Sequence, residues 1–443
     1  MKTNRVIKIF LASSEELEAD RYRFGNLIRK LDNIYEKRGI RIELFEWEDY
    51  DAAYNGMRKQ DEYNERVRAS DMFLALFHKK AGKFTIEEFN IARKAFDEQA
   101  SPKIYTYIKD LEAGESESRE LAEFKRLMLE ELGHYWCRYS NFDTMQLHFV
   151  LQLQMVEATT PIKVEVKESQ VKIGDSTIAD LNNVPFTSEN TTHKELKSRK
   201  EQLDREIGNA ESGGRRGFFG QRSRTTDEEL ANLRAERESV TEQIERQEKA
   251  LVDTAMSIAR MQGGECSSRM RTAAELFEKG ETGKAEAVLK EDDMEADATN
   301  AKLKFDTAAQ PTAELARNIE RCAGEYMLKA RIVISGIADE SRYLKAAKLM
   351  STAIDLVSGR LPEETLAEYL FDYAVLLTDA GQQTKALETW ERLSGIYERL
   401  YRKAPQKYAY GYAGVLNNMA VLYSNKGDFD HCLSKYLKAV DIY

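Results

Sequence analysis

Val6–Ala12 reads VIKIFLA, and this apolar run is the first of four that decide the fold of the N-terminal third of the chain. Each run has the length and composition of a buried strand, and amphipathic helical patterns alternate with the runs. Strands that alternate with helices form βαβ units, so the sequence predicts a doubly wound parallel sheet with helices on both faces. The other strands are expected at Ile40–Glu46, Met72–Phe77 and Ile104–Ile108, and the helices at Glu15–Arg38, Ile86–Phe96 and Gln146–Val156.

The composition is that of a helix-rich soluble protein. Hydrophobic residues make up 42% of the 443 residues and charged residues 32%, and only 6 residues are proline. The net charge of −10 disfavours nucleic acid as a partner, because polyanions bind basic surfaces. No apolar run approaches the roughly 20 residues of a membrane span, and the first ten residues lack a signal-peptide pattern. We therefore expect a cytoplasmic protein without a membrane span.

Cysteine and histidine are not spaced as they are in metal sites. The four cysteines include no close pair, and the five histidines show neither an HxxH nor an HExxH pattern. We therefore expect no bound metal and no disulfide framework, with the thiols reduced in a cytosolic protein.

Three segments follow the predicted α/β domain of residues 1–158. Apolar and polar side chains alternate over Ile162–Leu181 around a turn signal at Gly174-Asp175, which predicts a β-hairpin connector at residues 159–190. Residues 191–262 carry near-heptad apolar stripes on two charged arms, which predict a coiled-coil helical hairpin. Residues 263–443 are expected to form helices. The predicted fold class is thus an α/β domain followed by an all-α region.

The expected tip of the coiled-coil hairpin is rich in glycine and arginine. Arg215 and Arg216 precede two apparently exposed aromatic residues, Phe218 and Phe219. The pattern fits a contact site for an acidic partner, a nucleic acid or a membrane surface, and the more ordinary interpretation is a mobile, solvated loop.

Residues 263–443 contain an internal repeat. The run Tyr373–Leu377, followed by Gly381 and Ala386, matches a second run that begins at Asn418, since Gly427 lies 46 residues after Gly381. A more divergent copy has Ala274, Phe277, Gly280 and Ala285. The glycine permits the turn between paired helices, and the small residues permit their close approach.

This repeat resembles the tetratricopeptide repeat (TPR) with longer helices, and it implies an α-solenoid whose groove binds a protein or peptide trigger. Repeat arrays end in a polar cap, and none follows the last copy, so we expect the natural protein or its assembly to extend beyond Tyr443.

Polar side chains follow each of the first three predicted strands, at the edge where doubly wound sheets bind ligands. Ser13 and Ser14 follow the first strand, and they can cap a helix or present N–H groups to a phosphate. Trp47 follows the second strand and can stack on a base or serve as a half-buried anchor. The basic loop after the third strand leads into a helix that carries Glu87 and Glu88, whose ordinary role would be to complement the helix dipole.

Three runs in this region resemble the TIR-like domains of bacterial proteins, relatives of the SEFIR and nucleoside deoxyribosyltransferase-like group. They are KIFLASSEELEADR from Lys8, ELFEWED from Glu43 and SDMFLALFHKKAGKFTIEEFNIA from Ser70. In catalytic TIR domains a Trp-Cys-x-x-Glu-Leu segment opens the helix after the third strand, and its Glu is essential for cleaving NAD⁺ between nicotinamide and ribose. Phe84 and Thr85 take the Trp-Cys places in this chain, and Glu88 takes the place of the Glu.

The resemblance implies that NAD⁺ is a substrate and that no cofactor is permanently bound. Glu88 would be the catalytic carboxylate, with Glu87 as the alternative, because a carboxylate stabilises an oxocarbenium-like ribose. The residues expected to bind the dinucleotide are Ser13, Ser14, Trp47, Lys83, Phe84 and Thr85.

Three functions are open from the sequence. The first is an NAD⁺ glycohydrolase effector gated by self-association of TIR-like domains and by a TPR sensor, as in the bacterial anti-phage proteins that the chain resembles. The second is a TIR-like adaptor that binds partners or a nucleotide signal without catalysis. The third is a ribosyl-processing enzyme that uses the same carboxylate on free nucleosides or nucleotides. An open pocket shared by Glu88, Trp47 and the first loop would favour an enzyme, and a Glu88 that caps a helix on a closed surface would favour the adaptor.

Overall fold

The chain divides into two compact units. The computed structural model describes residues 5–46, 59–132, 134, 136–156, 163–212, 227–261, 266–336 and 340–442. The first unit comprises Met1–Val150, Lys163–Glu165 and Gln170–Val184, and the second comprises Leu151–Ile162, Val166–Ser169 and Pro185–Tyr443.

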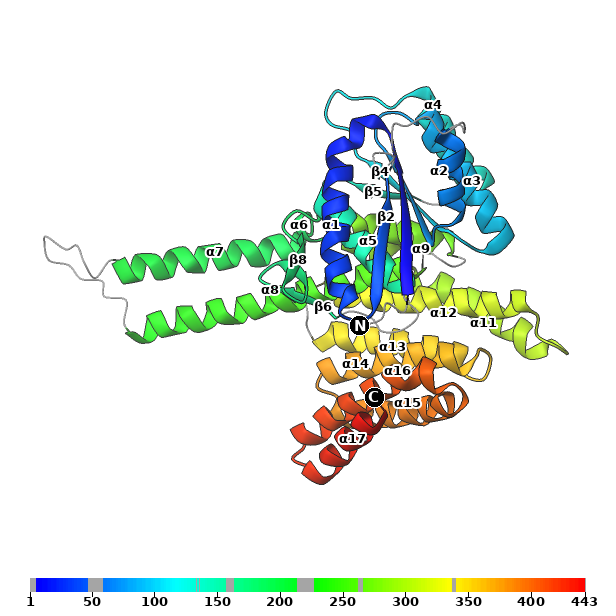
Figure 1. Ribbon diagram of the computed structural model, residues 1–443. Helices are drawn as coiled ribbons and strands as arrows, with labels where there is room; N and C mark the ends of the chain where they lie inside the picture. Colours follow the sequence, from blue (N-terminus) through cyan, green and yellow to red (C-terminus); the bar gives the residue numbers. More distant parts are fainter. Residues whose placement is uncertain are drawn as a thin grey trace, which may run out of the picture. The chain divides into compact units, whose positions relative to one another are not determined.

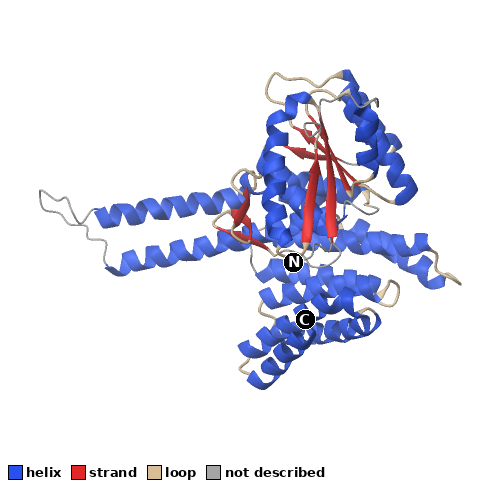
Figure 2. Ribbon diagram, viewed as in Figure 1, coloured by secondary structure: helices blue, strands red, loops and turns tan. Residues whose placement is uncertain are grey.

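A parallel five-stranded sheet forms the centre of the first unit (Figures 1 and 2). Its strands are β1 (Arg5–Ser13), β2 (Ile40–Phe45), β3 (Met72–Phe77), β4 (Lys103–Lys109) and β5 (Trp136–Tyr139). They lie in the order β2-β1-β3-β4-β5, and every neighbouring pair is parallel. This order confirms the predicted doubly wound α/β fold and places its topological switch point between β1 and β3.

Helices cover both faces of this sheet, as the buried strands require. They are α1 (Glu18–Glu36), α2 (Lys59–Arg68), α3 (Lys83–Gln99), α4 (Arg119–Arg126) and α5 (Phe142–Val156). On one face Phe24 of α1 packs edge-to-face on Phe149 of α5, with ring centroids 4.7 Å apart. On the other face Phe89 of α3 packs on Phe124 of α4 at 5.0 Å. A short 3-10 turn, Glu15–Leu17, precedes α1, so the expected single helix from Glu15 begins three residues later.

His134 is a half-buried polar group in this core. Its Nε2 lies 3.0 Å from Thr106 Oγ1, and its ring lies 5.7 Å from that of Phe89. Burial disfavours the imidazolium and lowers the pKa of His134 from 6.5 to about 4. The imidazole is therefore neutral near pH 7.

We expect His134 to make folding sensitive to acid. Between pH 6.5 and pH 4 the unfolded chain binds a proton that the folded chain excludes, so this contribution to stability is present above pH 6.5 and is lost as the pH falls. The loss amounts to up to about 3 kcal/mol. The measurement is the difference in urea midpoint between wild type and His134→Gln at pH 7 and pH 4.5. The difference should shrink at the lower pH, and an unchanged difference would contradict the assignment.

The segment expected as a hairpin forms three strands instead of two. These are β6 (Val164–Lys167), β7 (Gln170–Ile173) and β8 (Ser176–Asp180), in the order β6-β7-β8. The expected turn at Gly174-Asp175 joins β7 to β8, which pair antiparallel. The turn between β6 and β7 is formed by Glu168 and Ser169, both at positive φ, and no glycine marks it in the sequence. The additional strand was missed for that reason.

The second unit is helical, which confirms the predicted all-α region. Its helices are α6 (Pro185–Ser188), α7 (Thr191–Ser212), α8 (Asp227–Met261), α9 (Ser268–Glu278), α10 (Thr282–Val288), α11 (Glu291–Thr307), α12 (Ala313–Ile334), α13 (Glu340–Val357), α14 (Glu363–Asp379), α15 (Gln383–Lys403), α16 (Pro405–Asn425) and α17 (Phe429–Ile442). Successive helices from α11 to α17 pack against one another. In the described residues no helix is both long enough and apolar enough to cross a membrane.

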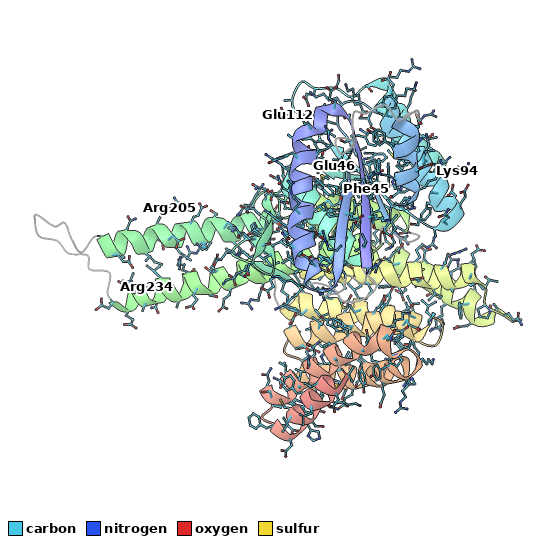
Figure 3. The ribbon with its side chains drawn as sticks, viewed as in Figure 1. Phe45, Glu46, Lys94, Glu112, Arg205 and Arg234 are labelled. Atoms are coloured by element: carbon cyan, nitrogen blue, oxygen red, sulfur yellow. The ribbon has the colours of Figure 1, made fainter. Side chains whose placement is uncertain are left out.

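Helices α7 and α8 form the two long arms of a hairpin (Figure 1). Leu203 of α7 is buried together with Val240 and Ile244 of α8, as the stripes in the sequence predict. Arg205 and Arg234 lie on the two arms (Figure 3). The arginine- and phenylalanine-rich tip lies outside the described residues.

A buried polar cluster lies at the base of this hairpin. The carboxylate of Glu248, which is 0% exposed, accepts hydrogen bonds from Ser169 Oγ at 2.7 Å and lies 2.9 Å from His193 Nε2. Burial opposes the charged form, yet these hydrogen bonds lower the pKa of Glu248, so the cluster holds an ionised carboxylate. It joins the β6–β7 turn to α7 and α8.

The repeat identified in the sequence corresponds to a repeated turn. Gly280, Gly381 and Gly427 follow α9, α14 and α16, with φ angles of +79°, +69° and +74°. This left-handed conformation ends a helix at little cost only when the residue is glycine.

Candidate functional site

The candidate site lies at the carboxyl ends of β1 and β3. These strands are hydrogen-bonded neighbours, and the chain leaves the sheet in opposite directions from them. The loops that follow them therefore flank the crevice in which doubly wound folds bind ligands. Ser13 ends β1, so the first loop begins at Ser14, and the second begins at His78.

The two serines at the carboxyl end of β1, Ser13 and Ser14, both bond to other groups of the protein. Ser13 Oγ accepts a hydrogen bond from the Arg21 guanidinium at 2.8 Å, and the same group donates to the Ser14 carbonyl at 2.9 Å. Ser14 stands at the N-cap position of the 3-10 turn, but its hydroxyl makes no capping bond. The expectation that these serines act as simple helix caps is therefore wrong for Ser14, whose hydroxyl donates to Glu16 Oε1 at 3.2 Å.

Glu16 bridges the two loops. Its Oε1 accepts hydrogen bonds from the backbone N–H of Lys79 at 3.0 Å and of Lys80 at 3.3 Å, in addition to the bond from Ser14. A carboxylate thus occupies the place where an anionic ligand would meet the loop after β3. No local pattern in the sequence indicates that the Glu16 side chain reaches across the crevice.

The basic loop after β3 is partly neutralised by a second carboxylate. Glu115, in the loop after β4, lies 2.5 Å from Lys79 Nζ and 3.3 Å from His78 Nε2. The hydrogen bond between the two side chains raises the pKa of Lys79 and lowers that of Glu115. Both are therefore charged near neutral pH.

The two candidate carboxylates on α3 have different surroundings. Glu88 is only 8% exposed and shares the inner face of the helix with Thr85 and Phe89. Glu87 is half-buried, and its Oε1 accepts a hydrogen bond from Asn64 Nδ2 of α2 at 3.2 Å. Helix α3 begins at Lys83 and has no acidic residue in its first turn, so both side chains lie beyond the turn in which the helix dipole acts most strongly.

The other predicted binding residues fall into two groups. Thr85 is buried on the same face as Glu88, one helical turn before it. Lys83 and Phe84 are exposed, and Phe84 retains 57% of its accessible surface. Trp47 lies outside the described residues. The structure therefore brings Thr85 and Glu88 together and leaves Lys83 and Phe84 at the surface.

Two features of this edge of the sheet were not predicted. Phe45, the last residue of β2, packs under the Arg66 guanidinium at 4.9 Å, and it lies beside Glu46 at the end of the strand (Figure 3). Asp20 of α1 accepts hydrogen bonds from Lys109 Nζ at 2.9 Å and Tyr139 Oη at 3.1 Å. Burial raises the pKa of Tyr139, which therefore remains a neutral donor. These contacts hold α1 against the carboxyl ends of β4 and β5.

No metal-binding arrangement is present in the described part of the chain, where no three His, Cys, Asp or Glu side chains are grouped to hold an ion. No protein-family model matches the chain, and the search of curated proteins found no significant match.

Proposed function

We propose that the first unit is an NAD⁺ glycohydrolase that uses Glu88 as its catalytic carboxylate. The observation that carries the proposal is a buried glutamate on the second turn of α3, the helix that follows the switch-point strand β3. Glu88 shares the inner face of α3 with the buried Thr85 and Phe89, so its carboxylate is withdrawn from solvent. Buried carboxylates at the ligand-binding edge of a doubly wound sheet are candidates for catalysis.

The chemistry suits one carboxylate. The bond between ribose C1′ and the nicotinamide nitrogen breaks, and its electron pair stays on the ring, so the cationic nicotinamide leaves as a neutral molecule. The ribose develops oxocarbenium character, which a nearby carboxylate stabilises electrostatically. Water then adds to C1′ and releases a proton. Because the leaving group needs no proton, a general acid is not required.

We propose that the helical unit regulates this activity through a protein or peptide partner. Helix α17 supports this part of the proposal, since Phe429, Leu433, Leu437 and Val440 lie on one face and are all exposed. An apolar helical face of this kind is typical of a protein-binding surface. A cytoplasmic effector of the TIR-TPR anti-phage type combines these two parts.

A TIR-like adaptor without catalysis is the second candidate. Arg21 bonds to Ser13, and Glu16 bonds to the N–H groups of Lys79 and Lys80. These internal bonds favour the adaptor, because they occupy the polar groups that a substrate would otherwise bind.

The test is nicotinamide release from NAD⁺ by the purified full chain over a series of protein concentrations. If self-association completes the site, turnover per chain should rise with protein concentration. Turnover that is constant per chain would exclude gating by self-association. Silence at every concentration, including with the chain fused to an oligomerising tag, would reject catalysis in favour of the adaptor.

A further inference from the structure

Three hydrogen-bond donors converge on one oxygen atom at the switch point. Glu16 Oε1 receives the N–H groups of Lys79 and Lys80 from the loop after β3 and the hydroxyl of Ser14 from the loop after β1. Ser14 is only 6% exposed, so its hydroxyl is held in place by the fold. The donors thus come from both sides of the crevice.

This arrangement is an anion site. Successive backbone N–H groups that point at one oxygen make a concave partial positive charge, and such groups bind carboxylates and phosphates alike. The carboxylate oxygen of Glu16 stands in for a phosphoryl oxygen. The nearby ammonium group of Lys79, although paired with Glu115, adds positive charge to the same loop.

The internal carboxylate is accessible from solvent. The side chain of Glu16 is exposed, and it belongs to the short 3-10 turn Glu15–Leu17, which is anchored by the buried Leu17. Glu16 can therefore rotate into solvent while the backbone and the three donors stay in place.

We infer that the Lys79 and Lys80 N–H groups and the Ser14 hydroxyl form a binding site for a phosphoryl group of a nucleotide, and that Glu16 closes this site in the resting chain. That this nucleotide is a dinucleotide substrate rests on the proposed function. A nucleotide must compete with a tethered anion, so its apparent affinity is reduced by the fraction of chains in which Glu16 is out of the site.

The experiment measures binding of ADP by isothermal titration calorimetry, with adenosine as the probe that lacks phosphate. Glu16→Ala should bind ADP on the order of tenfold more tightly than wild type, as expected if the site is open in roughly one chain in ten. Glu15→Ala is the matched control, because Glu15 is an exposed neighbour on the same turn and its substitution removes the same charge. Adenosine binding should be unchanged in both variants.

Three results would overturn the inference. Glu15→Ala and Glu16→Ala could raise the affinity for ADP equally, Glu16→Ala could leave the affinity for ADP unchanged, or Glu16→Ala could raise the affinity for adenosine as much as that for ADP. The first would indicate a general charge effect, and the others would exclude a phosphoryl site under Glu16. Glu15→Ala should keep the wild-type melting temperature, since the Glu15 side chain is exposed.

The inference and the proposed function can fail separately. If Glu16→Ala tightens ADP while the chain releases no nicotinamide, the phosphoryl site is supported and catalysis is rejected. If the chain releases nicotinamide while Glu16→Ala leaves ADP binding unchanged, the glycohydrolase stands and the phosphoryl site is rejected.

Discussion

Replacing Glu88 with glutamine is expected to reduce nicotinamide release from NAD⁺ by about 10²- to 10³-fold, the usual cost of losing one electrostatic stabiliser of a transition state. Glutamine keeps the volume and the hydrogen-bonding oxygen of the side chain but removes its charge, so it tests the charge itself. Because this charge acts mainly on the developing oxocarbenium ion, the loss should appear in kcat more than in KM. The measurement is steady-state nicotinamide release by the full chain.

Glu87→Gln is the matched control for this prediction. It removes the same charge from the adjacent position on the same helical turn, but its side chain is directed to Asn64 of α2. We expect it to change turnover less than threefold, because a partly exposed charge is screened by solvent. A large loss in Glu87→Gln with an active Glu88→Gln would transfer the catalytic role to Glu87. Equal and large losses in both would indicate that α3 itself had been disturbed.

Much of the α/β fold could be predicted because its strands are buried on both faces. β3 is buried at every position, and a run such as MFLALF has few alternatives to a central strand. β5 was missed because its four residues include the exposed Arg138 and make only a short apolar signal. α2 was missed because its sequence, KQDEYNERVR, is too polar to show an amphipathic stripe. Its position depends on packing across the sheet, which a local pattern does not contain.

The candidate site was predictable only in part for a similar reason. The strand pattern places Ser13, Ser14 and the loop after β3 at one edge, because parallel strands present their carboxyl ends together. Whether those groups face a ligand or each other depends on side-chain directions. Glu16 and Lys79 are 63 positions apart in the chain, and their contact arises only when β1 and β3 pair in register. The distinction between a buried Glu88 and an exposed Phe84 likewise follows from the helix orientation on the sheet.

The repeat glycines yield the largest expected effect on stability. Gly280→Ala should destabilise the helical unit by about 3 kcal/mol or more. An alanine at φ +79° is strained by about 1–2 kcal/mol, and a Cβ atom there would lie 2.8 Å from the Pro185 carbonyl oxygen and 2.9 Å from the Asn190 nitrogen. Backbone atoms cannot rotate away as a side chain can, so the end of α9 must move apart from α6 and the residues that follow it. That separation disturbs the stacked rings of Phe186 and Phe277, whose centroids are 5.5 Å apart.

Gly427→Ala isolates the conformational part of this cost. Gly427 occupies the same position of the repeat at φ +74°, but nothing lies within 4 Å of the Cβ atom that alanine would add. It should therefore lose only about 1–2 kcal/mol. The measurement is the urea midpoint of the far-ultraviolet circular dichroism transition for both variants beside wild type. If the two alanines shift the midpoint equally, the backbone contact at Gly280 contributes nothing and left-handed strain accounts for the whole effect. If Gly280→Ala shifts the midpoint more, the close backbone contact between Gly280 and the residues from Pro185 to Asn190 contributes to the stability of the helical unit.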